Sequence, residues 1–393
     1  MAIYKYTQTN PTIFGSGAVA QTGEEAKILG MKKVMLVTDA GVKAAGAAKK
    51  VKDSLEASGI EVVEFSDITP DPKDHEILKA AELGLKEKVD GIVAVGGGSV
   101  MDASKAIDIL QTNPLPLEQY YGSWDYKPIL PLICIPTTSG TGSENTIYGV
   151  VTYTGPDNKA IGQSGCKKVV LATASLALCD PELTYTMDAD LTGAVGLDAF
   201  AHAAESLTCL TSLTNPKADL MDIKAIEMIM KWLQKAVFEP TNQEARDNMM
   251  LAANFAGMGF TDTCCHIGHA FSQCYGAKYH VAHGISCAWA LPETMKFSAK
   301  YVPEKVKLVC DAMGIPYASD ISNDDLGNLV ADEIRKFMRK LKVKSIKDYG
   351  FTREETISIW DMILNDNCYP CIPGPMPEDE VKAFCGRVYD TYQ

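Results

Sequence analysis

Residues 91–110 read GIVAVGGGSVMDASKAIDIL and contain the clearest structural signal in the chain. Its first part, GIVAVG (91–96), is an apolar run typical of a buried strand, and VMDASKAIDIL (100–110) has the composition of a helix. The glycines between them allow the backbone to turn sharply and to approach a ligand closely. The pattern therefore predicts a strand–turn–helix unit with a helix N-terminus facing the turn.

Gly97, Gly98 and Ser99 in this turn are candidate phosphate-binding residues. Backbone amides and the positive end of the helix dipole favour an anion at such a position. Ser99 followed three residues later by Asp102 also fits a capping box, with Asp102 as its acidic member. The turn matches neither GxGxxG nor the Walker pattern, so a tight turn without a ligand is the alternative interpretation.

The same alternation of apolar runs and helical stretches extends over the first half of the chain. The other apolar runs are KKVMLVTD (32–39), EVVEF (61–65) and ILPLICI (129–135). Strands that are apolar on both faces and separated by helices indicate a parallel sheet covered on each side. We therefore predict an α/β domain over residues 1–190.

The second half lacks strand signals and contains amphipathic segments instead. In one of them Leu220, Ile223 and Ile226 recur at helical spacing, which places them on one apolar face. The segments predicted as helices are 217–237, 243–260, 303–314 and 323–341. We predict an all-α domain over residues 191–393.

A second polar loop, PTTSGTGSE (136–144), follows the predicted strand 129–135. It offers hydroxyl donors and unhindered amides at the carboxyl end of a strand, where open α/β sheets bind ligands. Thr137, Thr138 and Thr141 are the candidate contacts. Asp39 ends an earlier strand, where a carboxylate accepts hydrogen bonds from a ribose diol and repels a 2′-phosphate; a turn or helix cap is the alternative for this residue.

Histidines and one aspartate suggest a metal site. Four of the six histidines lie between residues 266 and 283, and Asp198 and His202 lie four residues apart on a predicted helix. A carboxylate with imidazoles suits Fe(II) or Zn(II) and differs from the all-oxygen sites of Ca²⁺ or Mg²⁺. Spacing alone does not choose among the four histidines, and Cys264–Cys265 with His266 is a rival soft site.

Several ordered motifs resemble those of the iron-containing, group III alcohol dehydrogenase family, which has a dehydroquinate-synthase-like fold. The resemblance covers nearly the whole chain, through FGSGAV, VTDAG, GGGSVMDASK, PTTSGTGSE, DPELT, GLDAFAHAAE and AHGISCAWALP. It implies an amino-terminal domain that binds a nicotinamide dinucleotide, a helical carboxyl-terminal domain, and one divalent metal. It also implies a homodimer.

The resemblance carries functional roles onto matching positions. It implies the metal ligands Asp198, His202, His269 and His283, with Fe(II) expected and Zn(II) as the alternative. On the cofactor side it implies Asp39 at the adenosine ribose, which favours NAD over NADP, and contacts from the residues Gly97, Gly98, Ser99, Asp102, Thr137, Thr138, Thr141 and Lys159.

One position departs from the family pattern. Many members have HxxxH where this chain has His269 followed by Gln273, and glutamine is no general base near neutral pH. His280 is the nearby titratable alternative for proton transfer, and a relay through the nicotinamide ribose hydroxyls would serve as well.

The function predicted is an NAD(H)- and metal-dependent oxidoreductase that interconverts a small alcohol and its aldehyde or ketone. The alternatives are a sugar-phosphate cyclase with bound NAD, for which the motifs offer no Lys/Arg cluster, and a non-catalytic nucleotide- or metal-binding protein.

The composition limits the partners. The 393-residue chain has 50 acidic and 37 basic residues and a formal net charge of −13, without a Lys/Arg cluster interleaved with aromatics, so nucleic acid is not expected as a partner. No apolar run reaches the roughly 20 residues that a membrane helix needs, and the first residues lack a signal-peptide pattern. We expect a cytoplasmic protein with no membrane partner.

Overall fold

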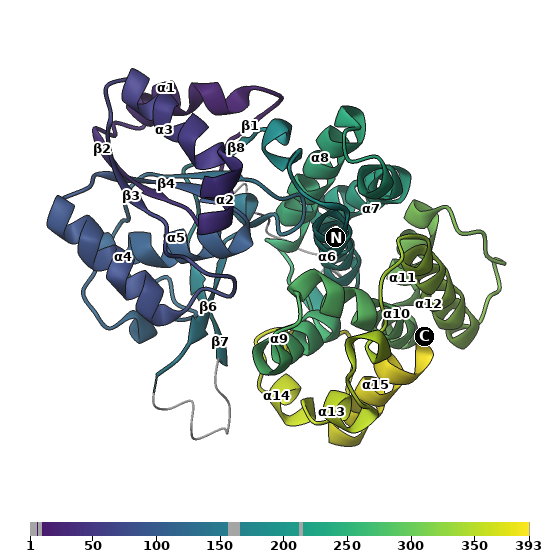
Figure 1. Cartoon of the computed structure of the whole chain (residues 1–393). Coiled ribbons are helices and arrows are strands. Elements are labelled where there is room, and N and C mark those ends of the chain that lie inside the picture. Colours follow the sequence, from purple (N-terminus) through teal and green to yellow (C-terminus); the bar gives the residue numbers. More distant parts are fainter. Residues whose placement is uncertain (1–5, 7–9, 156–165, 212–214, 393) are drawn as a thin grey trace. The chain divides into compact units, whose positions relative to one another are not determined.

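The computed structural model describes residues 6, 10–155, 166–211 and 215–392. They form two compact units, and the chain passes from one to the other between Met187 and Asp188. Each unit has its own layers and core and is described by itself below (Figure 1).

The first unit is built on a six-stranded sheet with the order β1-β8-β5-β4-β2-β3. All neighbouring strands run parallel. The strands are β1 (Thr12–Phe14), β2 (Lys33–Val37), β3 (Glu61–Phe65), β4 (Gly91–Gly96), β5 (Leu132–Pro136) and β8 (Leu176–Cys179). The predicted parallel sheet is therefore confirmed, and β1 and β8 are additional strands of three and four residues.

Helices cover both faces of this sheet. They are α1 (Thr22–Ile28), α2 (Ala40–Ala45), α3 (Ala47–Ala57), α4 (Asp74–Glu87) and α5 (Gly98–Thr112). Along β2, Val34 and Leu36 belong to one apolar core, together with residues of α1 and α3. Met35 and Val37 belong to the other core, with residues of α4 and α5. This division follows from the alternation of side chains along a strand, and Figure 1 shows the two pairs of helices on opposite sides of the sheet.

An antiparallel hairpin, β6 (Tyr148–Tyr153) and β7 (Cys166–Leu171), lies outside the main sheet and was not predicted. The buried Lys105 of α5 connects the segment before this hairpin to the helix. Its Nζ donates to the backbone oxygens of Ser143 and Thr146, at 2.8 and 3.0 Å. These bonds hold the loop that follows β5 against α5.

The second unit is helical. Its helices are α6 (Ala189–Thr208), α7 (Pro216–Phe238), α8 (Gln243–Phe260), α9 (Ile267–Tyr279), α10 (His283–Tyr301), α11 (Pro303–Met313), α12 (Asn323–Lys340), α13 (Arg353–Ile357), α14 (Trp360–Leu364) and α15 (Glu378–Thr391). The four helices predicted from periodicity are α7, α8, α11 and α12. Helix α6 is nearly all buried because it packs against α7, α8 and α10.

Short 3₁₀ helices connect several of these elements. They are η1 (Ala18–Gln21), η2 (Leu117–Tyr120), η3 (Ser143–Asn145), η5 (Pro181–Thr184), η7 (Lys347–Tyr349) and η8 (Tyr369–Cys371). The last of these lies between α14 and α15.

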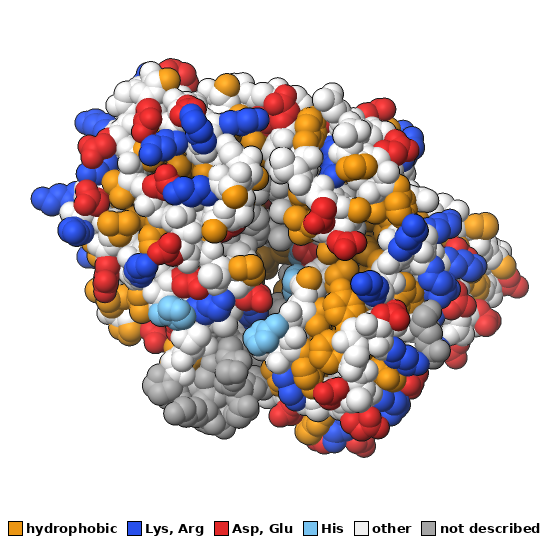
Figure 2. All heavy atoms as spheres, viewed as in Figure 1, with side chains coloured by type: hydrophobic (Ala, Val, Ile, Leu, Met, Phe, Trp, Pro, Cys, Tyr) orange, Lys and Arg blue, Asp and Glu red, His pale blue; other side chains and the backbone are white. Residues whose placement is uncertain are grey.

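Charged side chains of both signs are interspersed on the face shown in Figure 2. Many form local pairs, such as Lys27 with Glu24 at 2.9 Å and Lys336 with Glu333 at 2.6 Å. Among the helices that the structure describes, none has the length and apolar character to cross a membrane.

Candidate metal centre and dinucleotide loops

Helix α6 begins after Asp188, whose side chain caps the helix by accepting from the backbone N–H of Leu191 at 2.7 Å. Three polar side chains further along α6 lie on one face of the helix. Asp198, His202 and Glu205 follow at intervals of four and three residues, which places them on the same side. All three are buried in the helical unit, with exposed fractions of 6% or less.

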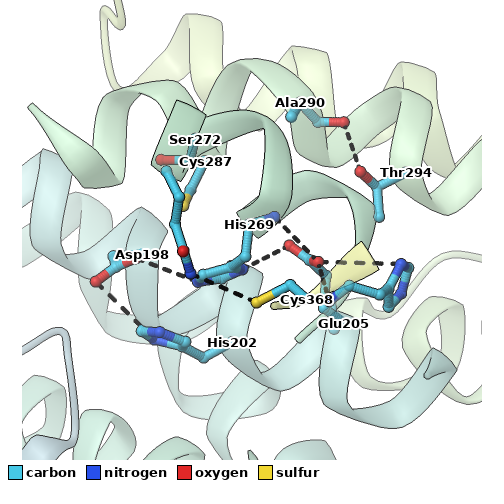
Figure 3. A network of polar contacts seen from close by, with 12 residues as sticks. Asp198, His202, Glu205, His269, Ser272, Cys287, Ala290, Thr294 and Cys368 are labelled. Carbon is cyan, nitrogen blue, oxygen red and sulfur yellow. Dashed lines mark hydrogen bonds and ion pairs between the residues drawn. The ribbon is translucent and has the colours of Figure 1, made fainter. Parts of the chain in front are cut away.

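Imidazoles from α6, α9 and α10 lie close to the Asp198 carboxylate, and Figure 3 shows those of His202 and His269 beside it. Oδ1 of Asp198 lies 3.8 Å from Nε2 of His269 and 3.7 Å from Nε2 of His283. Oδ2 lies 3.9 Å from Nδ1 of His202. The structure thus brings together the four residues predicted as metal ligands, at separations longer than hydrogen bonds.

Three polar atoms at the centre of this cluster are buried without a hydrogen-bond partner: Asp198 Oδ1, His202 Nδ1 and His269 Nε2. A buried polar atom without a partner costs about 1–3 kcal/mol. A cation bound among these atoms would satisfy them together. The residues present therefore fit a divalent metal ion, and the mixed N/O donor set is one that Fe(II) and Zn(II) accept.

Glu205 orients His269 from the side opposite Asp198 (Figure 3). Its Oε1 lies 2.7 Å from His269 Nδ1, while its Oε2 accepts from the backbone N–H groups of His266 and His269 at 2.8 and 3.2 Å. A carboxylate on the far nitrogen of a ligating histidine is a common arrangement in metal sites, where it fixes the ring and increases its basicity.

His283 is held at the first residue of α10. Its Nδ1 lies 2.9 Å from the hydroxyl of Ser272, so Nε2 faces Asp198. The next residue, Gly284, permits this approach, because a Cβ there would lie 2.1 Å from the backbone oxygen of Ala194 in α6. The third imidazole, that of His202, stacks on Phe260 with ring centroids 4.4 Å apart and the planes 10° from parallel.

The charges of the cluster shift its pKa values. Burial alone would raise the pKa of Asp198, but His202, His283 and His269 lower it below its ordinary value. Burial lowers the pKa of His202 to about 4, against the opposing effect of Asp198. Burial also opposes protonation of His283, but Cys287 and Asp198 outweigh it and raise the pKa of His283 to about 9.

The same balance applies to His269 and Glu205. Burial disfavours the imidazolium, yet Cys265, Cys287 and Glu205 raise the pKa of His269 well above its ordinary value. Burial would raise the pKa of Glu205, but His269 and His266 lower it to about 2. In the absence of a cation, these charges therefore favour the protonated forms of His269 and His283.

Two cysteines, Cys265 and Cys287, belong to the cluster. The ligand atoms of Asp198, His269, His283 and Cys287 all lie within 4.8 Å of one another, and those of His202, Cys265 and His269 do so as well. His266 belongs to neither set: it is fully buried and its Nε2 lies 2.9 Å from Thr208 Oγ1. Cys265 was predicted to form a rival site with Cys264 and His266. Its sulfur instead lies near the ligand atoms of His202 and His269.

The two residues considered for proton transfer have different surroundings. Gln273 is buried; its Nε2 donates to Cys368 Sγ at 3.4 Å and its Oε1 lacks a partner. His280 is exposed and ends α9 in a left-handed conformation, with φ 57°. Their roles in catalysis stay predictions.

The two predicted dinucleotide loops lie side by side in the first unit. Gly96 and Pro136 are paired at the ends of β4 and β5, and Thr137 donates its backbone N–H to Gly96 at 2.9 Å. A Cβ on Gly98 would lie 2.6 Å from Cγ2 of Thr141, so the glycine permits the contact between the loops. The residues that this brings together are Gly97, Gly98, Thr137, Thr138 and Thr141.

The predicted capping box at this turn is wrong. Gly97 is the N-cap of α5, without a side-chain cap, and Ser99 lies within the helix. Ser99 Oγ instead accepts from the backbone N–H of Asp71 at 3.3 Å. Asp102 accepts from the hydroxyl of Ser143 at 2.6 Å and so ties α5 to the loop after β5.

Asp39 is the N-cap of α2 and accepts from the backbone N–H of Val42 at 2.9 Å. It follows β2, the neighbour of β4, and therefore lies at the same edge of the sheet as the glycine turn. Lys159 lies outside the described residues.

Sequence reasoning missed Glu205, Ser272 and Cys287. Each follows a predicted ligand by three or four residues, as Glu205 does after His202, Ser272 after His269 and Cys287 after His283. Helical spacing from a known ligand is thus the signal that would have identified them.

Residues 9–181 match the model of the iron-containing alcohol dehydrogenases, and residues 192–389 match that of the carboxyl-terminal part of the same family. The chain is 35% identical over 346 residues to choline dehydrogenase of Bacillus subtilis, covering 86% of this chain and 84% of that protein.

Two solved structures are similar over nearly the whole chain. A 1,3-propanediol oxidoreductase has a TM-score of 0.91 and 30% identity, covering 99% of this chain and 100% of the other. Sulfoacetaldehyde reductase from Bifidobacterium kashiwanohense, in complex with NAD⁺, has a TM-score of 0.85 and 26% identity, covering 100% of both chains.

A parallel-sheet unit with a glycine turn, followed by a helical unit with a buried carboxylate–imidazole cluster, defines a class of metal-dependent oxidoreductases. The chain belongs to the iron-containing alcohol dehydrogenase family. The resemblance noted in the sequence is therefore confirmed, and with it an enzyme that oxidises alcohols or reduces aldehydes.

Proposed function

We propose that the enzyme interconverts a small alcohol and its aldehyde or ketone with NAD(H), and that one divalent metal ion binds at Asp198, His202, His269 and His283. The observation that carries this proposal is the set of buried atoms without partners, Asp198 Oδ1 and His202 Nδ1 on α6 and His269 Nε2 on α9. A divalent cation compensates them and neutralises the Asp198 carboxylate.

Fe(II) is the metal proposed for the enzyme as its family name suggests, and Zn(II) is the competitor. The imidazole and carboxylate donors suit both ions, and Zn(II) generally binds such donors more tightly than Fe(II) does. Occupancy then depends on which ion is available.

A bound divalent cation supplies positive charge that stabilises an alcohol oxygen as it loses its proton, and a nicotinamide supplies or accepts the hydride. The side chains of this chain prepare the site for that chemistry. Glu205 and Ser272 hold Nδ1 of His269 and His283, so that both Nε2 atoms face Asp198. Gln273 can form hydrogen bonds but cannot take up or release a proton near neutral pH. His280 or the ribose hydroxyls therefore carry the proton to solvent.

NAD is the dinucleotide proposed, because a relative with the same fold is known in complex with NAD⁺. Gly97, Gly98 and Ser99 would receive the pyrophosphate at the start of α5, and Asp39 the adenosine ribose. The hydroxyls of Thr137, Thr138 and Thr141 offer further contacts. Asp102 acts through its bond to Ser143, which holds the second loop in place.

We also propose a cytoplasmic homodimer that acts on a free small molecule, without a nucleic-acid or membrane partner. The net charge of −13 disfavours a polyanionic partner. Light scattering after size-exclusion chromatography measures the oligomeric state directly.

The function is tested with metal-free protein reloaded with Fe(II) under anaerobic conditions or with Zn(II). NADH oxidation is followed with a panel of short aldehydes and ketones, and NADPH is run in parallel. We expect turnover with at least one carbonyl compound and its loss after chelation or in Asp198→Ala. His75→Ala is the matched control, since it removes an exposed imidazole of the first unit.

Full turnover in chelated protein or in Asp198→Ala would contradict metal dependence. Stoichiometric metal without turnover on any compound of the panel would favour the non-catalytic alternative.

A further inference from the structure

Cys287 lies one helical turn after His283 on α10, on the same face of that helix. The side chain is fully buried, and its Sγ lies 3.6 Å from Nε2 of His283. It is therefore aimed at the same point as the predicted metal ligands, although nothing in the family pattern of three histidines and one aspartate requires a thiol there.

The distances in this group are equal to or slightly longer than those between neighbouring ligands of one metal ion. A tetrahedral ion with bonds of about 2.0–2.3 Å to N, O and S separates its ligand atoms by roughly 3.3–3.6 Å. The observed separations are 3.7 Å and 3.8 Å from Asp198 Oδ1 to the Nε2 atoms of His283 and His269, and 3.6 Å from His283 Nε2 to Cys287 Sγ.

His202 is placed differently. Its Nδ1 faces the other carboxylate oxygen of Asp198, and its ligand atom groups with Cys265 and His269. The ligand atom of Cys287 lies within 4.8 Å of those of Asp198, His269 and His283, so the thiol borders the site on the side away from His202.

We propose that Cys287 is a fifth metal ligand, whose thiolate binds the ion together with Asp198, His202, His269 and His283 in the substrate-free protein. The inference rests on the proposed metal site and adds a ligand to it. Cys287 binds as the thiolate, so any proton on its sulfur leaves to solvent as the metal–sulfur bond forms. A soft thiolate among imidazoles favours Zn(II) and Co(II) over Mg²⁺ or Mn²⁺.

The test measures the neighbours of the metal directly, without relying on activity. X-ray absorption of the wild-type protein loaded with one equivalent of Zn(II) is expected to show one sulfur at about 2.3 Å besides nitrogen and oxygen at about 2.0–2.1 Å. The Co(II)-loaded protein is expected to show a near-ultraviolet thiolate-to-metal charge-transfer band.

Two matched variants assign the sulfur. Cys287→Ser is expected to lose the charge-transfer band, and Cys265→Ser, which changes the other thiol beside His269, is expected to keep it. Both variants are compared at equal bound Co(II). If Cys287→Ser does not fold, the wild-type absorption spectrum still decides whether sulfur binds the ion.

The outcomes separate this proposal from the function on which it rests. A bound ion with only nitrogen and oxygen neighbours, or a band that survives in Cys287→Ser, overturns the role of Cys287 and leaves the metal site intact. A protein that binds neither Zn(II) nor Co(II) overturns both.

Discussion

Glu205 Oε1 lies 2.7 Å from Nδ1 of His269, and this contact decides which nitrogen of the imidazole is available to a metal. A carboxylate only accepts hydrogen bonds, so Nδ1 keeps its proton. The proton that a cation displaces is then the one on Nε2, which faces Asp198 at 3.8 Å. Two backbone N–H groups bind the other oxygen of Glu205 and prevent the carboxylate from turning away.

Glu205→Gln is expected to weaken divalent-metal binding by about 10–100-fold. The amide oxygen is needed by the two backbone N–H groups, so the NH₂ group would face Nδ1 of His269 and force the proton onto Nε2. Metal affinity is measured by competition with a chromophoric chelator, and circular dichroism reports the fold.

Asp222→Asn is the matched control for this substitution. Asp222 is also a fully buried carboxyl of the helical unit, but burial raises its pKa well above the ordinary value. Asparagine therefore replaces it without a large change in charge, and metal affinity should not change. An equal loss of affinity in both variants would mean that general loosening of the unit, and not the His269 contact, is responsible.

Gly284→Ala is expected to separate α10 from α6. The new Cβ would lie 2.1 Å from the backbone oxygen of Ala194 and 3.1 Å from Cβ of Asp198, so His283 must move away from Asp198. We expect a loss of about 1–3 kcal/mol in the free energy of unfolding and weaker metal binding. Chemical denaturation and the chelator competition measure the two effects.

Gly193→Ala tests whether any added methyl near α6 has this effect. Its Cβ would lie 3.7 Å from Cγ2 of Val237, an ordinary contact, and alanine favours the helix by up to about 1 kcal/mol. This variant should keep its metal affinity. Unchanged stability and affinity in Gly284→Ala would show that the two helices have room to adjust.

The parts of the fold that could be predicted are those with long, regular patterns. The runs that became β2, β4 and β5 are apolar on both faces, β3 is a short β-branched run, and the amphipathic helices carry their apolar faces in the sequence. Strands β1 and β8 have three and four residues, too few for a periodic signal. The β6–β7 hairpin lacks the continuous apolar run and the following helix that mark the buried parallel strands.

The site was predictable in its residue types but not in its contacts. Asp198 and His202 share a helix face, but only the family resemblance selected His269 and His283 among four close histidines. Which residues support them depends on packing between α6, α9 and α10, and sequence separations of 64 residues, as between Glu205 and His269, carry no local signal. Ser99 illustrates the opposite error, since a short local pattern predicted a cap that the helix does not use.

Metal binding by the wild-type protein is expected to strengthen as the pH rises. His283 has a pKa of about 9 in the metal-free protein, since Cys287 and Asp198 overcome the effect of burial. Below that pH the imidazolium must lose a proton before it can bind a cation, so affinity rises by about tenfold per pH unit for each proton released and levels off above the pKa. Titration calorimetry in buffers of different ionisation enthalpy counts these protons.

His283→Asn and His202→Asn provide the comparison for this count. The pKa of His202 is lowered to about 4, so its imidazole carries no extra proton at neutral pH. Both substitutions remove a predicted ligand, but only His283→Asn should reduce the number of protons released. The same proton count in wild type and His283→Asn would contradict the assignment.

Asp222→Asn is expected to change how stability depends on pH. Burial raises the pKa of Asp222 well above its ordinary value, so the folded state holds a proton that the unfolded state gives up at lower pH. The stabilising effect of this proton is fully present below the pKa of the unfolded state and is lost as the pH rises through the pKa of the folded state. The loss amounts to about 1.4 kcal/mol for each pH unit that separates these two pKa values.

Denaturation of metal-free protein at acidic and neutral pH measures this effect. The free energy of unfolding should fall less between the two pH values in Asp222→Asn than in the wild type. Parallel pH profiles would exclude a protonated Asp222.

Asp39 combines two roles that a pair of substitutions separates. Its carboxylate caps α2 by accepting from the N–H of Val42, and under the proposed function it also faces the adenosine ribose. Asp39→Ser keeps an oxygen that caps the helix, so the free energy of unfolding should stay within a few tenths of a kcal/mol. It removes the charge that repels a 2′-phosphate, so the preference for NADH over NADPH should fall. Asp39→Ala removes both and should also lose about 1 kcal/mol of stability. The ratio of kcat/KM for the two dinucleotides and the unfolding free energy are measured on both variants. An unchanged ratio in Asp39→Ser would leave Asp39 with the cap alone and move the choice of dinucleotide to another residue.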